Sequence, residues 1–287
     1  MADLTLYKVE TKASWCPGCG DFAVLRGVQI ALATLEINPK NVVVVSGIGC
    51  SSNLPGFIKS YGFHGIHGRA LPVASGAKLV NPDLKVIVTG GDGDGYGIGL
   101  GHFIHSMRRN LDITYVVMNN QVYGLTTGQA SPTTERTQRT KSTPKGVIEV
   151  PINPISLALV SGATFVARAF SGEADHLAKM VELGLNHKGF SLVDVLSPCV
   201  TYNKHNTYQW FRERVYKLED RGHNTKNLDE AIKKSYEWDA KIPVGVFFET
   251  ERPTYEDEEP GLGAGPIINQ PLGIDVALGK ELLKELE

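Results

Sequence analysis

Residues 86–95 read VIVTGGDGDG, a short apolar run that passes directly into a glycine-rich stretch containing Asp92 and Asp94. The β-branched run at 86–88 predicts a buried strand, and the glycines after it predict a tight loop. The loop leads into a helix-like pattern over residues 97–109. A strand, a loop and a helix in this order form the repeating unit of a parallel α/β sheet. The stretch therefore predicts an α/β fold.

The same unit recurs along the chain. Apolar runs rich in β-branched residues predict further buried strands at residues 42–45, 113–118, 165–166 and 192–196. Helix-like patterns lie between them at residues 22–35, 71–80 and 174–186. This alternation predicts a doubly wound, mostly parallel sheet, in which ligands bind at the carboxyl ends of the strands.

Length and charge limit the classes of protein that fit. The chain has 287 residues, 42% of them hydrophobic, which is enough for one large domain over residues 1–250. We expect a helical excursion at about 200–240 and a C-terminal arm at 251–287. The net charge is only -2, so we expect no nucleic-acid partner. No apolar run approaches the ~18 residues of a membrane span, and we see no signal peptide, so we expect no membrane association and a cytoplasmic location.

The glycine-rich loop has the chemistry of a metal–diphosphate site. Asp92 follows a predicted strand, where its carboxylate would be a hard oxygen ligand for Mg²⁺. The glycines beside it would let backbone N–H groups approach a diphosphate, aided by the positive end of the next helix. The following strand ends at Asn119-Asn120, which offers an amide oxygen, and the turn NQVYGLT offers backbone carbonyls.

Four cysteines suggest a second centre. They are Cys16, Cys19, Cys50 and Cys199, the first two in the motif WCPGCG. From the residues alone, this motif fits a redox disulfide, half of a zinc site or half of an iron–sulfur site. A zinc site with four thiolate ligands usually has two CxxC pairs, and a redox pair would leave two cysteines unexplained. Four soft thiolate ligands also suit one iron–sulfur cluster.

Together these motifs resemble a known family. GDG followed by NN resembles the thiamine diphosphate fingerprint. WCPGCG, GIGCSS, HGRA, GGDGDGYGIG, NNQVYGLTTGQ and SPC, in this order, resemble the β subunit of 2-oxoacid:ferredoxin oxidoreductases from about residue 10 to about residue 250. SPCVTYN is more similar to the 2-oxoglutarate members than to the pyruvate members.

The resemblance implies a thiamine-diphosphate-binding fold, of which this chain holds the diphosphate-binding domain, with Mg²⁺ and one [4Fe-4S] cluster. It implies that Asp92, the side chain of Asn120 and the carbonyl of Val122 ligate Mg²⁺. The four cysteines would ligate the cluster. The other residues implied to border the cofactor are Ile48, Gly49, Cys50, Ser51, His67, Gly93, Asp94, Gly124 and Leu125.

The resemblance also implies an activity. It is the oxidative decarboxylation of a 2-oxoacid, most similar to the 2-oxoglutarate members, with transfer of the acyl group to coenzyme A and of electrons to ferredoxin, or the reverse carboxylation. We expect an α subunit to supply the pyrimidine-binding domain and the activating glutamate, in an (αβ)₂ assembly. The alternatives are a pyruvate-specific member, a non-oxidative thiamine diphosphate decarboxylase, and a non-catalytic, zinc-stabilised binding module.

Overall fold

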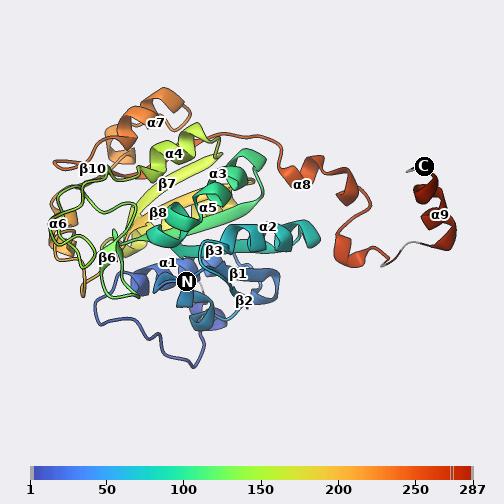
Figure 1. The fold of residues 1–287 in the computed structure, drawn as a ribbon, viewed down its shortest axis with the longest axis horizontal. Helices are drawn as coiled ribbons and strands as arrows, with labels where there is room; N and C mark the ends of the chain where they lie inside the picture. The colour runs from blue at the N-terminus through green and yellow to red at the C-terminus, as the bar shows by residue number, and fades with distance from the viewer. Residues whose placement is uncertain (1–2, 272, 274, 286–287) are drawn as a thin grey trace.

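An eight-stranded sheet forms the centre of the computed structural model, which describes residues 3–271, 273 and 275–285 (Figure 1). Its strands lie in the order β2-β1-β3-β4-β8-β7-β10-β9. Their bounds are β1 Val42–Ser46, β2 Tyr61–His64, β3 Lys85–Gly91, β4 Ile113–Asn119, β7 Phe165–Phe170, β8 Ser191–Leu196, β9 Val215–Lys217 and β10 Ile242–Glu249. All neighbours are parallel except β7 and β10. The predicted mostly parallel sheet is confirmed.

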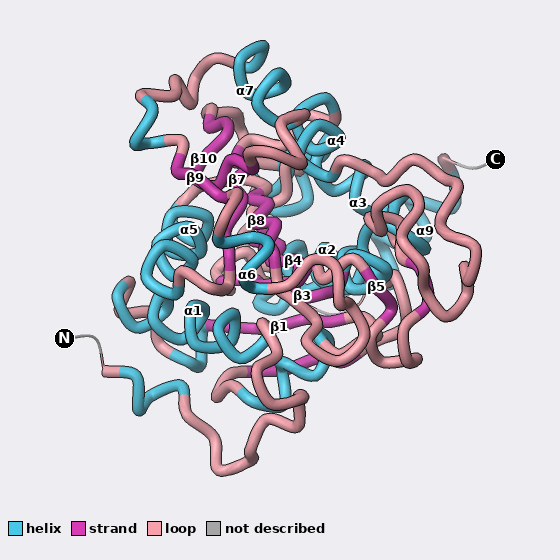
Figure 2. Tube along the Cα trace, turned by 90° about the vertical axis from the view of Figure 1, so that its left-hand side faces the viewer, coloured by secondary structure: helices cyan, strands magenta, loops and turns pink. Residues whose placement is uncertain are grey.

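Helices cover both faces of the sheet, as Figure 2 shows for α1 and α5 on one side and α3 and α4 on the other. The α-helices are α1 Asp21–Thr34, α2 Ala70–Val80, α3 Leu100–Arg109, α4 Pro154–Val160, α5 Ala174–Asn186, α6 Tyr208–Arg212, α7 Leu228–Ser235, α8 Tyr255–Glu258 and α9 Val276–Lys284. The remaining helical turns are η1 Leu4–Tyr7, η2 Pro39–Asn41, η3 Ser51–Phe57, η4 Gly93–Ile98, η5 Glu219–Arg221, η6 Pro260–Leu262 and η7 Ile267–Asn269. None of the described helices is long and apolar enough to cross a membrane.

Alternation along β4 shows why the sheet needs two helical layers. Val116 and Met118 belong to the core beneath α1 and α5, whereas Tyr115 and Val117 belong to the core beneath α2, α3 and α4. All four side chains are at most 1% exposed, since successive strand residues point to opposite faces. A central parallel strand buried on both faces is therefore a continuous apolar run, which is why the sequence revealed it.

The region after residue 199 differs from the expected helical excursion. It contains α6 and α7, but also β9, which pairs in parallel with β10. Strand β10 then returns antiparallel to β7 and extends the sheet. Pro243 lies within β10. Because a proline inside an apolar run argues against a central strand, the sequence pattern did not predict β10. The domain boundaries themselves stay a prediction.

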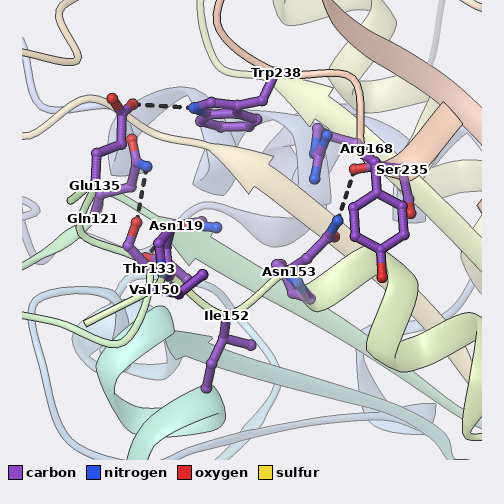
Figure 3. A pocket seen from close by; sticks show the side chains of 13 residues that line it. Asn119, Gln121, Thr133, Glu135, Val150, Ile152, Asn153, Arg168, Ser235 and Trp238 are labelled. Atoms are coloured by element: carbon purple, nitrogen blue, oxygen red, sulfur yellow. Dashed lines mark hydrogen bonds between the residues drawn. The ribbon is translucent and has the colours of Figure 1, made fainter. Parts of the chain in front are cut away.

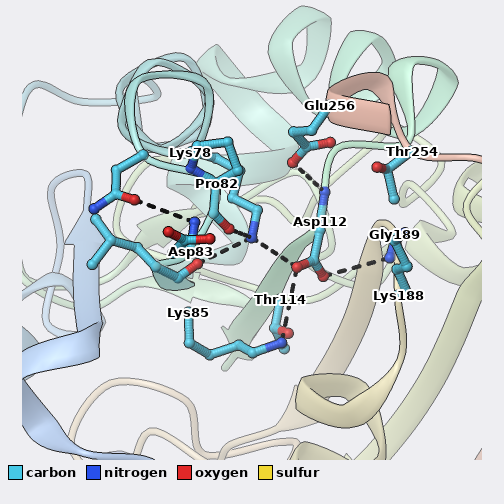
Figure 4. A network of polar contacts seen from close by, with 12 residues as sticks. Lys78, Pro82, Asp83, Lys85, Asp112, Thr114, Lys188, Gly189, Thr254 and Glu256 are labelled. Carbon is cyan, nitrogen blue, oxygen red and sulfur yellow. Dashed lines mark hydrogen bonds and ion pairs between the residues drawn. The ribbon is translucent and has the colours of Figure 1, made fainter. Parts of the chain in front are cut away.

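The C-terminal segment is attached at the amino end of β4 (Figure 4). The backbone N–H of Asp112 donates to Glu256 of α8 at 3.0 Å, and Lys188 pairs with Asp257 at 2.8 Å. Lys78 holds Asp112 in place with an ion pair of 2.8 Å. Beyond α8 the chain leads to α9, which lies well away from the sheet in Figure 1. This attachment is at the edge opposite the carboxyl ends of the parallel strands.

Candidate functional site

Asp92 lies where the sequence predicts it, directly after β3, and its side chain is only 1% exposed. Its Oδ2 accepts hydrogen bonds from the hydroxyls of Ser131, at 2.5 Å, and Thr133, at 2.6 Å. Burial raises the pKa of Asp92 to about 6, because an ionised carboxylate is poorly solvated there. A bound cation would favour the ionised form, so the environment suits a metal ligand.

The next strand brings the other proposed Mg²⁺ ligands to the same edge. Asn120 follows β4, and its Oδ1 accepts a hydrogen bond from the N–H of Val122 at 3.1 Å. Gln121 between them has a φ of 58°, so the chain turns sharply at this point. Because β3 and β4 are parallel neighbours, their carboxyl ends place Asp92 beside this turn.

One pocket joins all of the residues implied to border the cofactor. Its volume is about 250 Å³. The lining includes Ile48, Gly49, Cys50, Ser51, His67, Asp92, Gly93, Asp94, Asn120, Val122, Gly124 and Leu125. Gly91, Tyr123 and Thr126 complete it. Residues from four separate segments therefore converge at the carboxyl ends of β1, β2, β3 and β4.

The described residues that line this pocket include no lysine or arginine, and His67 is the one basic side chain among them. A diphosphate held here would depend on a metal ion and on backbone N–H groups for its counter-charge. The chain supplies both elements: a buried carboxylate with nearby amide and carbonyl oxygens, and the first turn of η4 directly after Asp92. The donor set therefore fits a Mg²⁺–diphosphate group.

Asp94 has a different environment from the one its motif suggested. Its Oδ1 accepts hydrogen bonds from the backbone N–H of Ile48 at 2.9 Å and of Gly68 at 2.7 Å, and lies 2.9 Å from Nδ1 of His67. The carboxylate thus joins the loop after β1 to the loop before α2. Its proposed contact with a diphosphate would have to come from its backbone.

We expect Asp94→Ala to destabilise these loops. Removing the acceptor leaves the N–H groups of Ile48 and Gly68 without their partner, at a cost of about 2 kcal/mol or more. The melting temperature of the chain should fall by about 4 °C or more. Thermal unfolding of Asp94→Ala, compared with the exposed control Asp83→Ala, measures this. Equal melting temperatures in the two variants would contradict the role.

The four cysteines line a second pocket, together with Trp15, Asn53, Val200 and Tyr202. Cys16 is exposed, Cys199 is buried, and the other two are partly exposed. Two contacts assemble the set: the N–H of Gly20 donates to the carbonyl of Pro198 at 3.3 Å, and Nε1 of Trp15 donates to the carbonyl of Cys50 at 2.7 Å. All four cysteines are free, so none is paired in a disulfide.

The four thiols lie around one pocket. No group of three or more His, Cys, Asp and Glu among the described residues is disposed to hold one metal ion. The cysteines instead line a pocket with a volume of about 250 Å³. Burial raises the pKa of Cys50 to about 11, so this thiol needs a metal centre to ionise it. Four soft thiolates around one pocket are a donor set that fits an iron–sulfur cluster.

The two pockets share a wall. Cys50, Asn120, Gly124 and Leu125 line both of them. A Cβ at Gly124 would lie 3.6 Å from Sγ of Cys50, 3.7 Å from Sγ of Cys199 and 3.8 Å from Nδ2 of Asn120. Two sulfur atoms of the cysteine set and the side chain of a proposed Mg²⁺ ligand therefore border the same space beside Gly124.

The sequence did not reveal Ser131 and Thr133, the two partners of Asp92. They lie 39 and 41 residues from it, in the run Ser131-Pro132-Thr133-Thr134, which has no distinctive spacing. Another pocket lies on the far side of Thr133, between this segment and residues such as Ile152, Arg168 and Trp238 (Figure 3). No motif in the sequence pointed to that pocket either.

The fold and this site define a thiamine diphosphate enzyme domain. Residues 47–195 match the family described as "Thiamine pyrophosphate enzyme, C-terminal TPP binding domain". Residues 199–263 match the C-terminal family of the pyruvate ferredoxin oxidoreductase beta chain. The chain belongs to the β subunits of the 2-oxoacid:ferredoxin oxidoreductases, as the following relatives show. The expected thiamine-diphosphate-binding fold and family are thereby confirmed.

The chain is similar to several named proteins. The chain is 50% identical over 262 residues, covering 88% of this chain and 82% of the other, to 2-oxoacid:ferredoxin oxidoreductase 1, subunit beta, of Aeropyrum pernix. It is 37% identical over 245 residues, covering 85% and 90%, to the 2-oxoglutarate synthase subunit KorB of Methanocaldococcus jannaschii. Both names describe subunits, which implies a partner chain.

A solved structure is also similar. It is the 2-oxoglutarate:ferredoxin oxidoreductase from Magnetococcus marinus with 2-oxoglutarate, coenzyme A and succinyl-CoA bound. The TM-score is 0.90 at 39% identity, covering 99% of this chain and 96% of that chain. The likeness therefore extends over nearly the whole chain.

Proposed function

We propose that the chain is the β subunit of a 2-oxoglutarate:ferredoxin oxidoreductase that binds thiamine diphosphate, Mg²⁺ and one [4Fe-4S] cluster. The enzyme would convert 2-oxoglutarate and coenzyme A to succinyl-CoA and CO₂, passing two electrons to ferredoxin, or run in reverse. The observation that carries this proposal is the pair of adjoining pockets. One is lined by all four cysteines, the other contains Asp92, and both share Cys50 and Gly124.

The residues of this chain have separate tasks in the proposal. Asp92, the side chain of Asn120 and the carbonyl of Val122 hold Mg²⁺. The backbone of Gly93, Asp94, Gly124 and Leu125 contacts the diphosphate, with His67 close by. The loop Ile48-Gly49-Cys50-Ser51 borders the thiazolium and pyrimidine rings. Thiamine diphosphate would supply, when bound, a carbanion that adds to a 2-oxo carbon and a ring that accepts the electron pair left behind when CO₂ departs.

The four cysteines hold the cluster, which supplies one-electron acceptance beside the cofactor pocket. The loop that carries Cys50 belongs to both pockets, so it keeps the two centres adjacent. The α subunit would supply the pyrimidine-binding domain and the activating glutamate, in an (αβ)₂ assembly. Two relatives are named as 2-oxoglutarate enzymes, which supports this substrate over pyruvate.

Metal analysis of the complex purified without oxygen tests the proposal. We expect about four irons and four acid-labile sulfides per β chain beyond those of the partner, and thiamine diphosphate with Mg²⁺. Reduction of ferredoxin should require coenzyme A and be faster with 2-oxoglutarate than with pyruvate. About one zinc and no sulfide would contradict the cluster. Activity of the isolated β chain would contradict the need for an α subunit.

A further inference from the structure

The carboxylate of Asp92 accepts hydrogen bonds from two buried hydroxyls. Both Ser131, 7% exposed, and Thr133, 3% exposed, donate to Oδ2, and neither reaches Oδ1. Two donors on one oxygen fix the plane of the carboxylate. We infer that Ser131 and Thr133 are positioning residues, which orient Asp92 so that its other oxygen is available to Mg²⁺. The inference rests on the proposed function, because it deepens the same metal site.

A short hairpin brings the hydroxyls to the aspartate. Strand β5, Val122–Tyr123, pairs antiparallel with β6, Gln129–Ala130, and the register places Val122 opposite Ala130. Ser131, the next residue, therefore returns to the level of the turn after β4. The same hairpin carries the carbonyl of Val122, a proposed Mg²⁺ ligand. One local element thus presents a ligand and the groups that orient another ligand.

Hydrogen bonds within the chain hold the segment after the hairpin in place. Nε2 of Gln121 donates to the carbonyl of Thr133 at 3.0 Å, and the hydroxyl of Thr134 donates to the carbonyl of Gln121 at 2.7 Å. The N–H of Ser131 in turn donates to Oγ1 of Thr134 at 2.7 Å. These bonds tie the hydroxyl-bearing segment to the turn beside Asn120. Groups held by such bonds are suited to orient a metal ligand.

Thr133 has a second acceptor, which connects the metal site to the core. Its Oγ1 lies 3.0 Å from Oδ1 of Asn119, compared with 2.6 Å from Asp92. Asn119 donates to Asp194 at 3.1 Å, and Asp194 pairs with Arg168 at 3.3 Å. A hydroxyl has one proton, and the shorter contact is to the acidic acceptor, which forms the stronger bond when ionised. The arrangement directs that proton toward Asp92.

The test measures binding of thiamine diphosphate to the αβ complex while Mg²⁺ is titrated. In Thr133→Val we expect the Mg²⁺ concentration at half-saturation to rise about 10–100-fold, the range typical when a group that orients a metal ligand is lost. Saturating Mg²⁺ should restore cofactor affinity to near wild type, which general damage to the site would not allow. Thr133→Ser should recover most of the Mg²⁺ dependence, because it keeps the hydroxyl.

Thr114→Val is the matched control. Thr114 is also a buried threonine, 3% exposed, but its hydroxyl donates to the carbonyl of Gly184 near the start of β4, away from the site. This variant should keep the wild-type Mg²⁺ dependence. If Thr133→Val does not fold, Ser131→Ala tests the same role with a smaller change.

The outcomes separate the inference from the proposed function. A folded Thr133→Val variant with the wild-type Mg²⁺ dependence would overturn the positioning role and leave the proposed function standing. If Thr133→Val does not fold, the same result for Ser131→Ala would overturn it. Wild-type complex that binds thiamine diphosphate equally well without Mg²⁺ would overturn both. A shift in Thr133→Val that Thr133→Ser reverses and Thr114→Val lacks would support the inference.

Discussion

The αβ complex with Asp92→Asn is expected to lose Mg²⁺-dependent binding of thiamine diphosphate by more than about 100-fold, beyond the range of a group that only orients a metal ligand. Asparagine has nearly the same shape but carries no charge. The described residues that line the pocket include no lysine or arginine, so neither type of side chain is present among them to replace the metal as counter-charge for a diphosphate. Ferredoxin reduction should fall with cofactor binding. Calorimetric titration of thiamine diphosphate with and without Mg²⁺ measures the loss.

The same substitution should leave the fold intact. Burial raises the pKa of Asp92 from 3.8 to about 6, so between these values the folded chain favours the protonated, neutral form. Stability from this group is present below about pH 3.8 and is lost as the pH rises through about 6. At pH 7 a neutral asparagine should therefore not lower the melting temperature of the cofactor-free chain. Asp83→Asn, at an exposed position, is the control for charge removal, and unchanged cofactor binding in Asp92→Asn would contradict the role.

Cys199→Ser is expected to have the second large effect. Cys199 is 9% exposed and follows β8 at the edge where the other cysteines gather. Serine is a hard, weakly acidic donor and a poor substitute for a thiolate on iron. Iron and acid-labile sulfide of the β chain should fall from about four each to below one, and ferredoxin reduction should fall to background.

Reconstitution with iron and sulfide provides the control for Cys199→Ser. Wild-type complex stripped of iron should regain its cluster, whereas the variant should not. This comparison distinguishes a missing ligand from incomplete loading during purification. A variant that keeps a full cluster and full ferredoxin reduction would contradict the assignment of Cys199.

The sequence was most informative where one local rule applies. The apolar run at 113–118 predicted β4 because a strand buried on both faces is apolar throughout. The parallel sheet then predicted that Asp92 and Asn120 meet at one edge, and they line one pocket. Helix α4 had a readable start, since Asn153 caps it and Pro154 is its first residue, yet it was not predicted.

The missing information concerns contacts between distant segments. Asp94 fits the diphosphate motif by position, but its carboxylate accepts hydrogen bonds from two loops that the topology brings together. Ser131 and Thr133 were overlooked because serine and threonine occur in most loops, and their partner is decided by the β5–β6 register. Single-sequence patterns report local periodicity, whereas these pairings require the folded chain.

The wall that the two pockets share at Gly124 has a thermodynamic consequence. A group that occupies one pocket would be bordered by Cys50, Asn120 and Gly124, which also border the other pocket, so binding at one would couple to binding at the other. Such coupling is reciprocal, so each occupant changes the binding affinity of the other by the same factor. The β subunit would therefore retain its inorganic and organic cofactors as a cooperative pair, and loss of either would loosen the other.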